Sequence, residues 1–408
     1  MKTPSAILLM ASGVLSLTLQ AQAAPLSLQD MTTLAVARAP QVRALQMGSQ
    51  AQTEEAHASG EWPDPKIKIG EEKLPVSDFR ATDQTMDVIG VAQMIPGGNK
   101  LPLAVAASRL NAEKMQADAS LTRLSIRRDA ALAWLDAVYA RAQIRLLAQQ
   151  LHTQERQAQA QRLALAHGQG SLAGAAAADR ARLLLADRIA QVQTDQRKAD
   201  AQVVRWVGLA DLPDTLPELD APPPLAELDE RLERHPAILV RGKETDLATN
   251  ALQQAREAKV PDWEFELSYG RARTPGMPNT LTAMVSFNLP IRPGARQDRL
   301  AAARNLDLEA AAATRDAELQ SLRAELAADY ADWLGLDGRL NQLATTLPQR
   351  AGHLLASNIA GYANGSATFD QVSDARQSAI DDALKLLELR YQRDRARLAL
   401  DYFVPADR

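Results

Sequence analysis

Apolar residues recur every three or four positions over two very long stretches of this chain, and this spacing predicts α-helices. The stretches run from about Leu101 to Ala166 and from about Gln297 to Tyr362. At roughly 1.5 Å per residue, each helix would be about 100 Å long. A helix of this length needs packing partners along its whole length, and the second stretch carries a coiled-coil seam. The seam consists of Leu319, Leu322, Leu326, Trp333, Leu336, Leu340, Leu343 and Leu347.

A short turn follows each long stretch, at residues 167–171 and 363–366. Further helical patterns begin near Leu172 and Thr368, and they run to about Val207 and Phe403. Each half of the chain is therefore predicted to form a long helical hairpin.

Two pairs of short segments with alternating apolar and polar residues interrupt the helical pattern. The first members of the pairs are 66–69 and 263–269, and the return segments are 85–95 and 280–290. Alternation of this kind predicts half-buried β-strands. We expect the connecting loops at residues 73–84 and 271–279.

The order of predicted elements occurs twice, and landmark residues repeat at a nearly constant distance along the chain. This regularity predicts an internal duplication. The landmark pairs are Pro40 with Pro236, Gly170 with Gly365, and Asp179 with Asp374, which are 196, 195 and 195 residues apart.

The predicted organisation has four parts. Residues 1–23 have the charged start, apolar run and small residues of a signal peptide. Residues 24–207 form the first repeat and 226–404 the second, with a proline-rich linker at 208–225. The repeats open with helices from about Ser27 to Gly60 and from about Leu225 to Lys259.

Charge and composition narrow the function. The net charge of −4 argues against a nucleic-acid-binding protein. The chain has no cysteine, which excludes disulfides and cysteine nucleophiles. We also expect no N-terminal lipid anchor, because such an anchor is attached to a cysteine. The histidines are scattered, and no catalytic or metal-binding motif is present, so neither a catalytic residue nor a metal ligand nor a cofactor is predicted.

The strand segments have about the length that a tilted membrane strand needs. A barrel in lipid must close, because an open edge leaves polar backbone groups without partners. Bacterial barrels have at least about eight strands, whereas one chain offers four. If the strands lie in lipid, three copies would supply a shared barrel of about 12 strands. The predicted fold is thus mainly α with a small β part, in which hairpins form an α-helical barrel and a trimer shares the β-barrel.

A duplicated helix–strand–strand–hairpin unit behind a signal peptide resembles the TolC family of outer-membrane efflux proteins. The resemblance covers nearly the whole predicted mature chain. It is carried by "QMIPGGNKLPLAVAASRLNAE" (93–113), by "NLPIRPGARQDRLAAARNLDLEA" (288–310) and by the two hairpin turns. The phrases "WPDPKIKIG" and "QMIPGGNK" look closest to the CzcC/CusC-like branch, which serves heavy-metal resistance pumps.

The resemblance implies a homotrimeric exit duct, with its barrel in the lipid of the outer membrane and its helices in the periplasm. Its partners would be a periplasmic adaptor (membrane fusion protein) and an inner-membrane pump of the RND type. The turns that would contact the adaptor contain Gly168, Gly170, Ser171, Asn364, Gly365 and Ser366.

Family members narrow the periplasmic end with acidic residues after the second turn. Asp374 matches one of these positions, whereas Gln371 stands where a second aspartate is expected, with Asp370 beside it. The alternative is that Asp374 simply lies on the solvent-exposed face of its helix and has no role in a constriction. In the strands, the alternation makes Lys66, Lys68, Glu264 and Glu266 the candidates for the barrel lumen.

Three functions remain open at this point. The leading hypothesis is an efflux duct for heavy-metal cations. The same family includes multidrug and type I secretion outlets, which differ in cargo. From another class comes a periplasmic coiled-coil adaptor or structural protein that never enters lipid. An enzyme is not expected.

Overall fold

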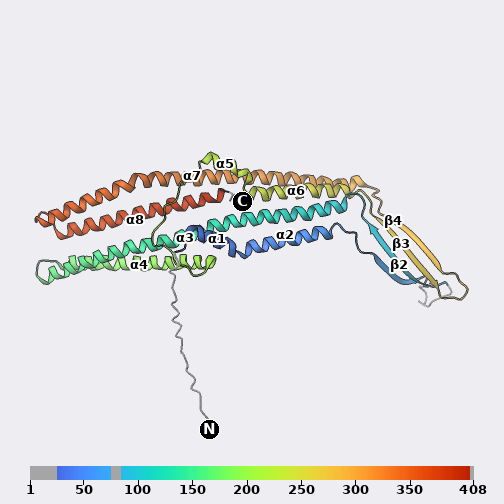
Figure 1. Cartoon of the computed structure of the whole chain (residues 1–408), viewed down its shortest axis with the longest axis horizontal. Coiled ribbons are helices and arrows are strands. Elements are labelled where there is room, and N and C mark those ends of the chain that lie inside the picture. Colours follow the sequence, from blue (N-terminus) through green and yellow to red (C-terminus); the bar gives the residue numbers. More distant parts are fainter. Residues whose placement is uncertain (1–24, 75–83, 405–408) are drawn as a thin grey trace, which may run out of the picture.

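The computed structural model describes residues 25–74 and 84–404, and it is mostly helical with one small sheet (Figure 1). The predicted signal peptide and most of the predicted loop at 73–84 lie outside the described residues. The same order of elements occurs twice: two shorter helical segments, two strands and two long helices. The first series comprises α1 (Leu28–Arg38), α2 (Pro40–Ala58), β1 (Lys66–Glu72), β2 (Met86–Ile95), α3 (Lys100–Ala166) and α4 (Leu172–Val207). The second comprises α5 (Leu225–Arg231), η1 (Leu232–Arg234), α6 (Pro236–Glu257), β3 (Trp263–Ala272), β4 (Thr280–Phe287), η2 (Pro293–Ala295), α7 (Gln297–Ala363), α8 (Phe369–Leu400) and η3 (Asp401–Phe403).

The fold class predicted from the sequence is confirmed. The two longest helices, α3 and α7, have 67 residues each, and their observed ends differ from the predicted ends by no more than one residue. The hairpin turns α3–α4 and α7–α8 lie at one end of the molecule, and the sheet lies at the other (Figure 1). The molecule is therefore elongated along the helix axes.

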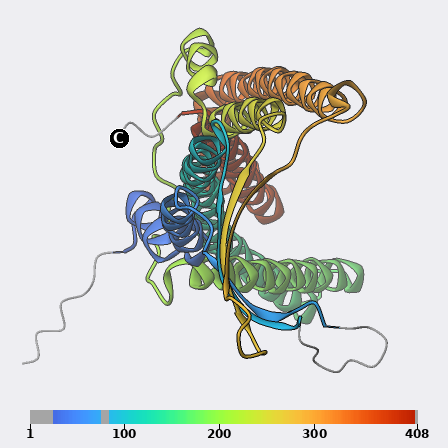
Figure 2. The same cartoon turned by 90° about the vertical axis from the view of Figure 1, so that its right-hand side faces the viewer.

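Helix α3 occupies the centre of the helical part. It packs against α4 and α8, and also against α2 and α6. Viewed along the long axis, α7, α8, α3 and α4 follow one another along an open arc (Figure 2). In a single chain, α4 and α7 are therefore the two outermost helices of this open arc.

The helix that precedes each strand pair is interrupted, which corrects the prediction of one continuous helix in each half. The breaks fall at Ala39 and His235, whose ψ angles of 111° and 137° are extended. A proline follows each of them, Pro40 and Pro236. Proline disfavours the helical conformation in the residue before it, yet it is well suited to the first position of a new helix. Both breaks therefore have a local cause.

The main core gathers around Trp134 of α3, which is 2% exposed. Its indole Nε1–H donates to the Leu26 carbonyl at 2.8 Å and so ties the start of the described chain to α3. Residues of α1, α4 and the 208–224 connection complete this core, including Met31, Val203 and Leu212. A second cluster joins α5 and α6 to α7 and η3.

Helix α7 is far less buried than α3, although the two helices have equal length. The buried residues of α7 are Leu322, Leu326 and Leu340, all members of the predicted seam. Other apolar residues of α7 are strongly exposed, such as Leu334 at 58% and Leu354 at 51%. A single chain therefore covers only part of the apolar surface of α7.

Candidate functional site

The four strands form one antiparallel sheet in the order β1-β2-β3-β4. One row of paired residues runs from Lys68 through Gly90 and Ser268 to Thr282. Directly paired residues point to the same side of a sheet, so the register assigns every side chain to a face. Strand β4 ends at Phe287, three residues before the predicted end, and Pro290 lacks the N–H that a ladder requires.

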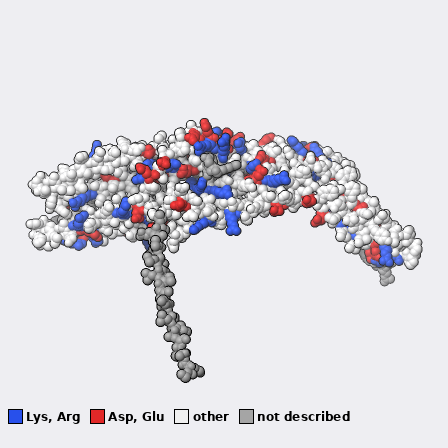
Figure 3. All heavy atoms as spheres, in the orientation of Figure 1, with Lys and Arg blue, Asp and Glu red and all other residues white. Residues whose placement is uncertain are grey.

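One face of the sheet is apolar and exposed over most of its length, up to a charged end where Glu71, Asp87 and Arg271 lie in one row. Its apolar side chains are between 44% and 81% exposed. They are Ile67, Ile69, Ile89, Val91, Phe265, Leu267, Tyr269, Leu281, Val285 and Phe287. Contiguous apolar surface on this scale marks an interaction with a partner or a membrane. The space-filling view shows few charged side chains on the visible part of the sheet between its two ends (Figure 3).

The opposite face carries the four charged residues proposed from the strand alternation, and it pairs them. The Lys66 Nζ lies 3.8 Å from Glu264 Oε2, and Lys68 makes a shorter contact with Glu266. These pairs join β1 to β3 although β2 lies between them. The lysines can pass over β2 because its residues in these rows are Gly90 and Ala92. The charges of these four residues are thus compensated within one chain.

Strands β1 and β4 are the two edges of this sheet. Each edge presents a row of backbone N–H and C=O groups that no described strand of this chain pairs. Edges of this kind pair readily with other strands. The sheet is therefore ready to be extended by strands of another chain.

The first hairpin turn depends on its glycines. Gly168 has a φ of 73°, which an L-residue with a side chain adopts at a cost. A Cβ on Gly170 would lie 2.7 Å from the Leu165 nitrogen, so only glycine fits. Ser171 then caps α4, because its hydroxyl accepts the Gly174 N–H at 3.0 Å.

The second turn has a similar construction. Gly365 has a φ of 79°. Asn364 Oδ1 accepts the Ser366 hydroxyl at 2.6 Å and the Ser366 N–H at 3.1 Å. Thr368 and Gln371 then form a capping box at the start of α8, with mutual bonds of 2.8 and 3.2 Å.

The structure corrects the pairing of the two turns. Gly168 and Gly365 share the same conformation, and the capping residues Ser171 and Thr368 are equivalent. Both pairs are 197 residues apart, not 195. Asp374 therefore corresponds to Ala177 in the first hairpin and not to Asp179, which pairs with Arg162 of α3.

The three residues proposed for the periplasmic constriction lie in different surroundings. The side chain of Gln371 is engaged in the capping box. Asp370 accepts a hydrogen bond from Gln161 of α3. Asp374 is exposed, and its carboxylate makes no hydrogen bond or ion pair with any residue that the structure describes. Of the three, Asp374 is the carboxylate that stays free to act on solvent or ions.

A ladder of side-chain bonds between α3 and α8 was missed by the sequence reasoning. Gln150 donates to Asp381 at 3.0 Å, Gln154 donates to Gln377, and Gln161 donates to Asp370 at 2.8 Å. We call these three bonds the α3–α8 ladder. The spacing of its residues repeats on each helix and could have been read as one polar stripe. The partner helix, however, lies more than 200 residues away in the sequence.

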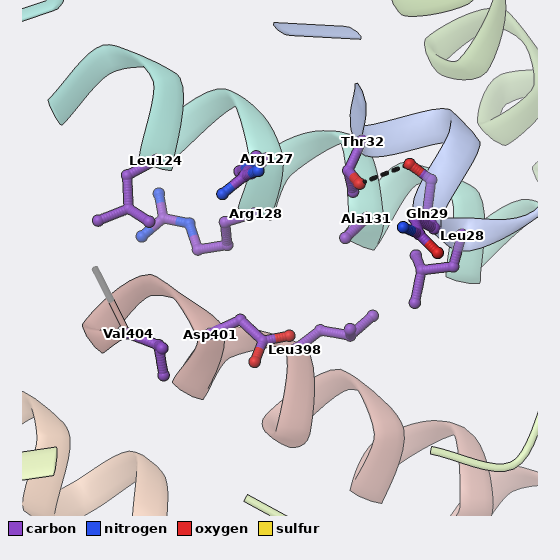
Figure 4. Close-up of a pocket in the computed structure, with 10 residues that line it drawn as sticks. All are labelled: Leu28, Gln29, Thr32, Leu124, Arg127, Arg128, Ala131, Leu398, Asp401 and Val404. Atoms are coloured by element: carbon purple, nitrogen blue, oxygen red, sulfur yellow. Dashed lines mark hydrogen bonds between the residues drawn. The ribbon is translucent and has the colours of Figure 1, made fainter. Parts of the chain in front are cut away.

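A cavity of about 340 Å³ lies between α1, α3 and the end of α8 (Figure 4). Leu124, Ala131, Leu398 and Val404 supply apolar walls, and Arg127, Arg128 and Asp401 lie near one another around the gap. Asp401 is already paired with Arg397. Arg128 lies over the Tyr402 ring at 4.6 Å. These contacts give the cavity a structural role at the junction of three helices.

Two further features are absent from the described residues. Within residues 25–74 and 84–404, no cluster of three or more His, Cys, Asp or Glu side chains could hold a metal ion. Among the helices described, none is both long and apolar enough to cross a membrane.

Comparison with known proteins agrees with this geometry. Residues 228–403 match the sequence profile of the family described as "Outer membrane efflux protein". No curated protein matches the chain significantly.

Several solved structures are similar over most of their length. The open state of the MtrE outer membrane channel of Neisseria gonorrhoeae has a TM-score of 0.78 at 17% identity, covering 94% of this chain and 89% of that one. The CmeC outer membrane channel of Campylobacter jejuni has a TM-score of 0.73 at 14% identity, with coverages of 93% and 85%. CusC, described in connection with transmembrane channel formation, has a TM-score of 0.74 at 15% identity, with coverages of 91% and 90%.

These identities are low, so the likeness establishes the fold alone. The three TM-scores are also similar, and they do not single out the heavy-metal branch. The second half of this chain thus matches the outer membrane efflux protein family, and the described chain has the fold of these outer-membrane channels.

Proposed function

We propose that this protein is the outer-membrane exit duct of a tripartite efflux system. One observation carries the proposal: the sheet has an exposed apolar face, a charged face and two open edges. A closed barrel satisfies all three features at once, with lipid outside, water inside and no unpaired edge.

The barrel would be shared by a homotrimer. Three sheets of four strands supply about 12 strands, which is enough for a membrane barrel. The helical part needs the same partners, because its helices form an open arc (Figure 2) and α7 leaves apolar residues uncovered. The helices of three copies would enclose a duct about 100 Å long.

The hairpin turns at the opposite end would meet a periplasmic adaptor. They carry exposed apolar side chains, among them Leu172 at 75% and Tyr362 at 54%. An inner-membrane pump of the RND type would supply the energy. The duct itself needs no catalytic group, so we propose a transporter component and not an enzyme.

We propose heavy-metal cations as the cargo, which rests on the sequence resemblance in residues 62–70 and 93–100. Asp374 supports a preference for cations near the turns, because an unpaired carboxylate attracts them. On the charged face of the sheet, by contrast, the lysine–glutamate pairs cancel. Multidrug or type I secretion outlets have the same architecture and remain the alternative for cargo.

A periplasmic coiled-coil adaptor or structural protein would leave the apolar face of the sheet in water. The exposed apolar row therefore favours the duct over that class.

Deletion of the protein tests the cargo. We expect reduced tolerance to zinc, cobalt, cadmium or copper, restored by the wild-type chain but not by a chain that lacks β1 and β2. Unchanged metal tolerance with lost tolerance to hydrophobic drugs would reject the heavy-metal cargo and favour the multidrug alternative. Recovery of the protein as a soluble periplasmic monomer would reject the duct.

A further inference from the structure

The connection between β4 and α7 carries exposed apolar and basic side chains that the proposed duct leaves without a role. We call Leu289, Ile291, Arg292 and Arg296 the junction patch. Leu289 is 66% exposed and Ile291 is 83% exposed. The patch lies where the sheet meets the long helices, in the bend of the molecule (Figure 1).

The patch continues the apolar face of the sheet. In β4, the odd-numbered Leu281, Val285 and Phe287 lie on that face, and Leu289 and Ile291 extend the same alternation past the end of the strand. Phe287 also packs on Trp263, with ring centroids 4.7 Å apart. Going towards the helices, an apolar face is thus followed by an aromatic pair and then by arginines. Membrane proteins have this order at the boundary between hydrocarbon and headgroups.

The charges of the junction are unbalanced in favour of the arginines. Asp262 is paired with Lys100 at 2.7 Å and accepts the Gly97 N–H, and Asp298 is paired with Lys259. The guanidinium groups of Arg292 and Arg296 make no ion pair or hydrogen bond with any described residue. A cavity of about 450 Å³ opens beside Arg296, with Val260, Leu289 and Leu300 in its wall.

We propose that the junction patch binds the phosphate group of an anionic phospholipid at the periplasmic surface of the membrane. The guanidinium groups of Arg292 and Arg296 would donate to phosphate oxygens, for which arginine has a matching geometry. Leu289 and Ile291 would enter the layer beneath the headgroups. This inference rests on the proposed function, because it requires the apolar face of the sheet to lie in lipid.

A second copy of the chain is the competing occupant. Glu61 and Asp64 precede β1 at the other edge of the sheet, and their carboxylates also lack partners among the described residues. If β1 of one copy lies beside β4 of the next, these carboxylates would come near the arginines. The high exposure of Leu289 and Ile291 beside the arginines favours lipid, since the carboxylates would not cover them.

The test compares the full-length wild type with Arg292→Gln/Arg296→Gln. The matched control is Arg339→Gln/Arg350→Gln, which removes the same charge from exposed side chains of α7 that have no described partner. The thermal midpoint of the detergent-solubilised protein is measured with added phosphatidylglycerol and with added phosphatidylcholine. We expect phosphatidylglycerol to raise the midpoint more than phosphatidylcholine in the wild type and the control. In the patch variant this difference should fall at least two-fold.

Other outcomes would overturn the inference in distinguishable ways. A patch variant that keeps the full lipid difference contradicts it directly. If inorganic phosphate alone reproduces the protection, the site takes a free anion and not a lipid. If Glu61→Gln/Asp64→Asn and the patch variant weaken assembly equally in both lipids, the patch is a contact between copies. Insertion of the wild type into lipid vesicles separates the two proposals. A wild type that does not insert contradicts the proposed duct as well, whereas one that inserts but shows no lipid preference contradicts only lipid binding at the junction patch.

Discussion

Gln161 on α3 donates its side-chain amide to a carboxylate oxygen of Asp370 on α8 at 2.8 Å, so the two hairpins are joined beside their turns. The α3–α8 ladder continues this connection towards the middle of the helices through Gln154 and Gln150. A duct that opens at its turns has to loosen contacts of this kind.

We expect Gln154→Leu/Gln161→Leu to let the two turns move apart. Each lost bond removes about 0.5–1.5 kcal/mol of net stabilisation between the hairpins. Because the chain has no cysteine, spin labels can be placed on single introduced cysteines at Gln169 and Ala367. Electron-spin distance measurements should then show a broader and longer distribution between the labels. The control Gln149→Leu/Gln159→Leu changes exposed glutamines outside the ladder, and an equal effect there would contradict this role.

Glycine substitutions test the turn geometry. Gly168→Ala should destabilise the protein by about 1–2 kcal/mol, because its φ of 73° is unfavourable for alanine. Gly170→Ala should cost more, since its Cβ would lie 2.7 Å from a backbone nitrogen. Gly242→Ala in α6 meets nothing within 4 Å and should be neutral or stabilising. Thermal unfolding of the three variants gives the ranking, and equal stabilities would contradict it.

His235 makes the stability depend on pH. Burial lowers the pKa of its imidazole below the ordinary value of 6.5, while Nδ1 accepts the Ala237 N–H and Nε2 contacts the Tyr402 carbonyl at 3.0 Å. A depressed folded-state pKa means that the unfolded chain binds the proton more readily. The contribution is therefore fully present above about pH 6.5 and is lost as the pH falls through the lowered folded-state pKa.

We expect the midpoint temperature of thermal unfolding to decrease as the pH is lowered from 7.5 to 5.5. His235→Asn keeps an acceptor for the helix N-terminus but cannot titrate. This variant should be less stable at pH 7.5 and should lose part of the pH dependence. An unchanged slope in the variant would show that other groups cause the effect.

The lysine–glutamate pairs of the sheet predict ion selectivity. Lys68→Gln leaves Glu266 uncompensated on the charged face. In planar bilayers under a salt gradient, the reversal potential should therefore shift towards the value of a cation-selective channel. Lys68→Gln/Glu266→Gln restores neutrality and should return the potential towards the wild-type value. No shift in the single variant would mean that this face does not line the conducting path.

Much of the fold could be predicted because its signals are local. The helical periodicity and the turns that follow it predicted the ends of α3 and α7 to within one residue, and the alternation around Lys66 and Glu264 assigned these residues to one face. The capping box was also readable, since Thr368 and Gln371 have its spacing, yet Gln371 was assigned to the constriction instead.

What remained hidden depends on the relative position of distant elements. The pairing of Gln161 with Asp370 requires the register of two helices more than 200 residues apart. The equivalence of Gly168 and Gly365 appeared only from their backbone angles, because the nearby Gly170 fits the letters as well. A pattern of residue types cannot decide between alignments that differ by two positions.

In the proposed duct, β1 of one copy pairs with β4 of the next in a membrane-embedded trimer. The chain has no cysteine of its own, so pairs of introduced cysteines can test this contact. Each double variant has one cysteine at Ile69 on β1 and a second on β4, at Leu281, Ala283 or Val285. We predict that oxidation of the outer-membrane fraction gives cross-linked species that end at three copies for at least one pair. The control combines Ile69→Cys with Val91→Cys on the inner strand β2 and should give no cross-link between copies. If all three edge pairs gave only monomers, recovered in the soluble periplasmic fraction, β1 and β4 would not pair between copies in a membrane.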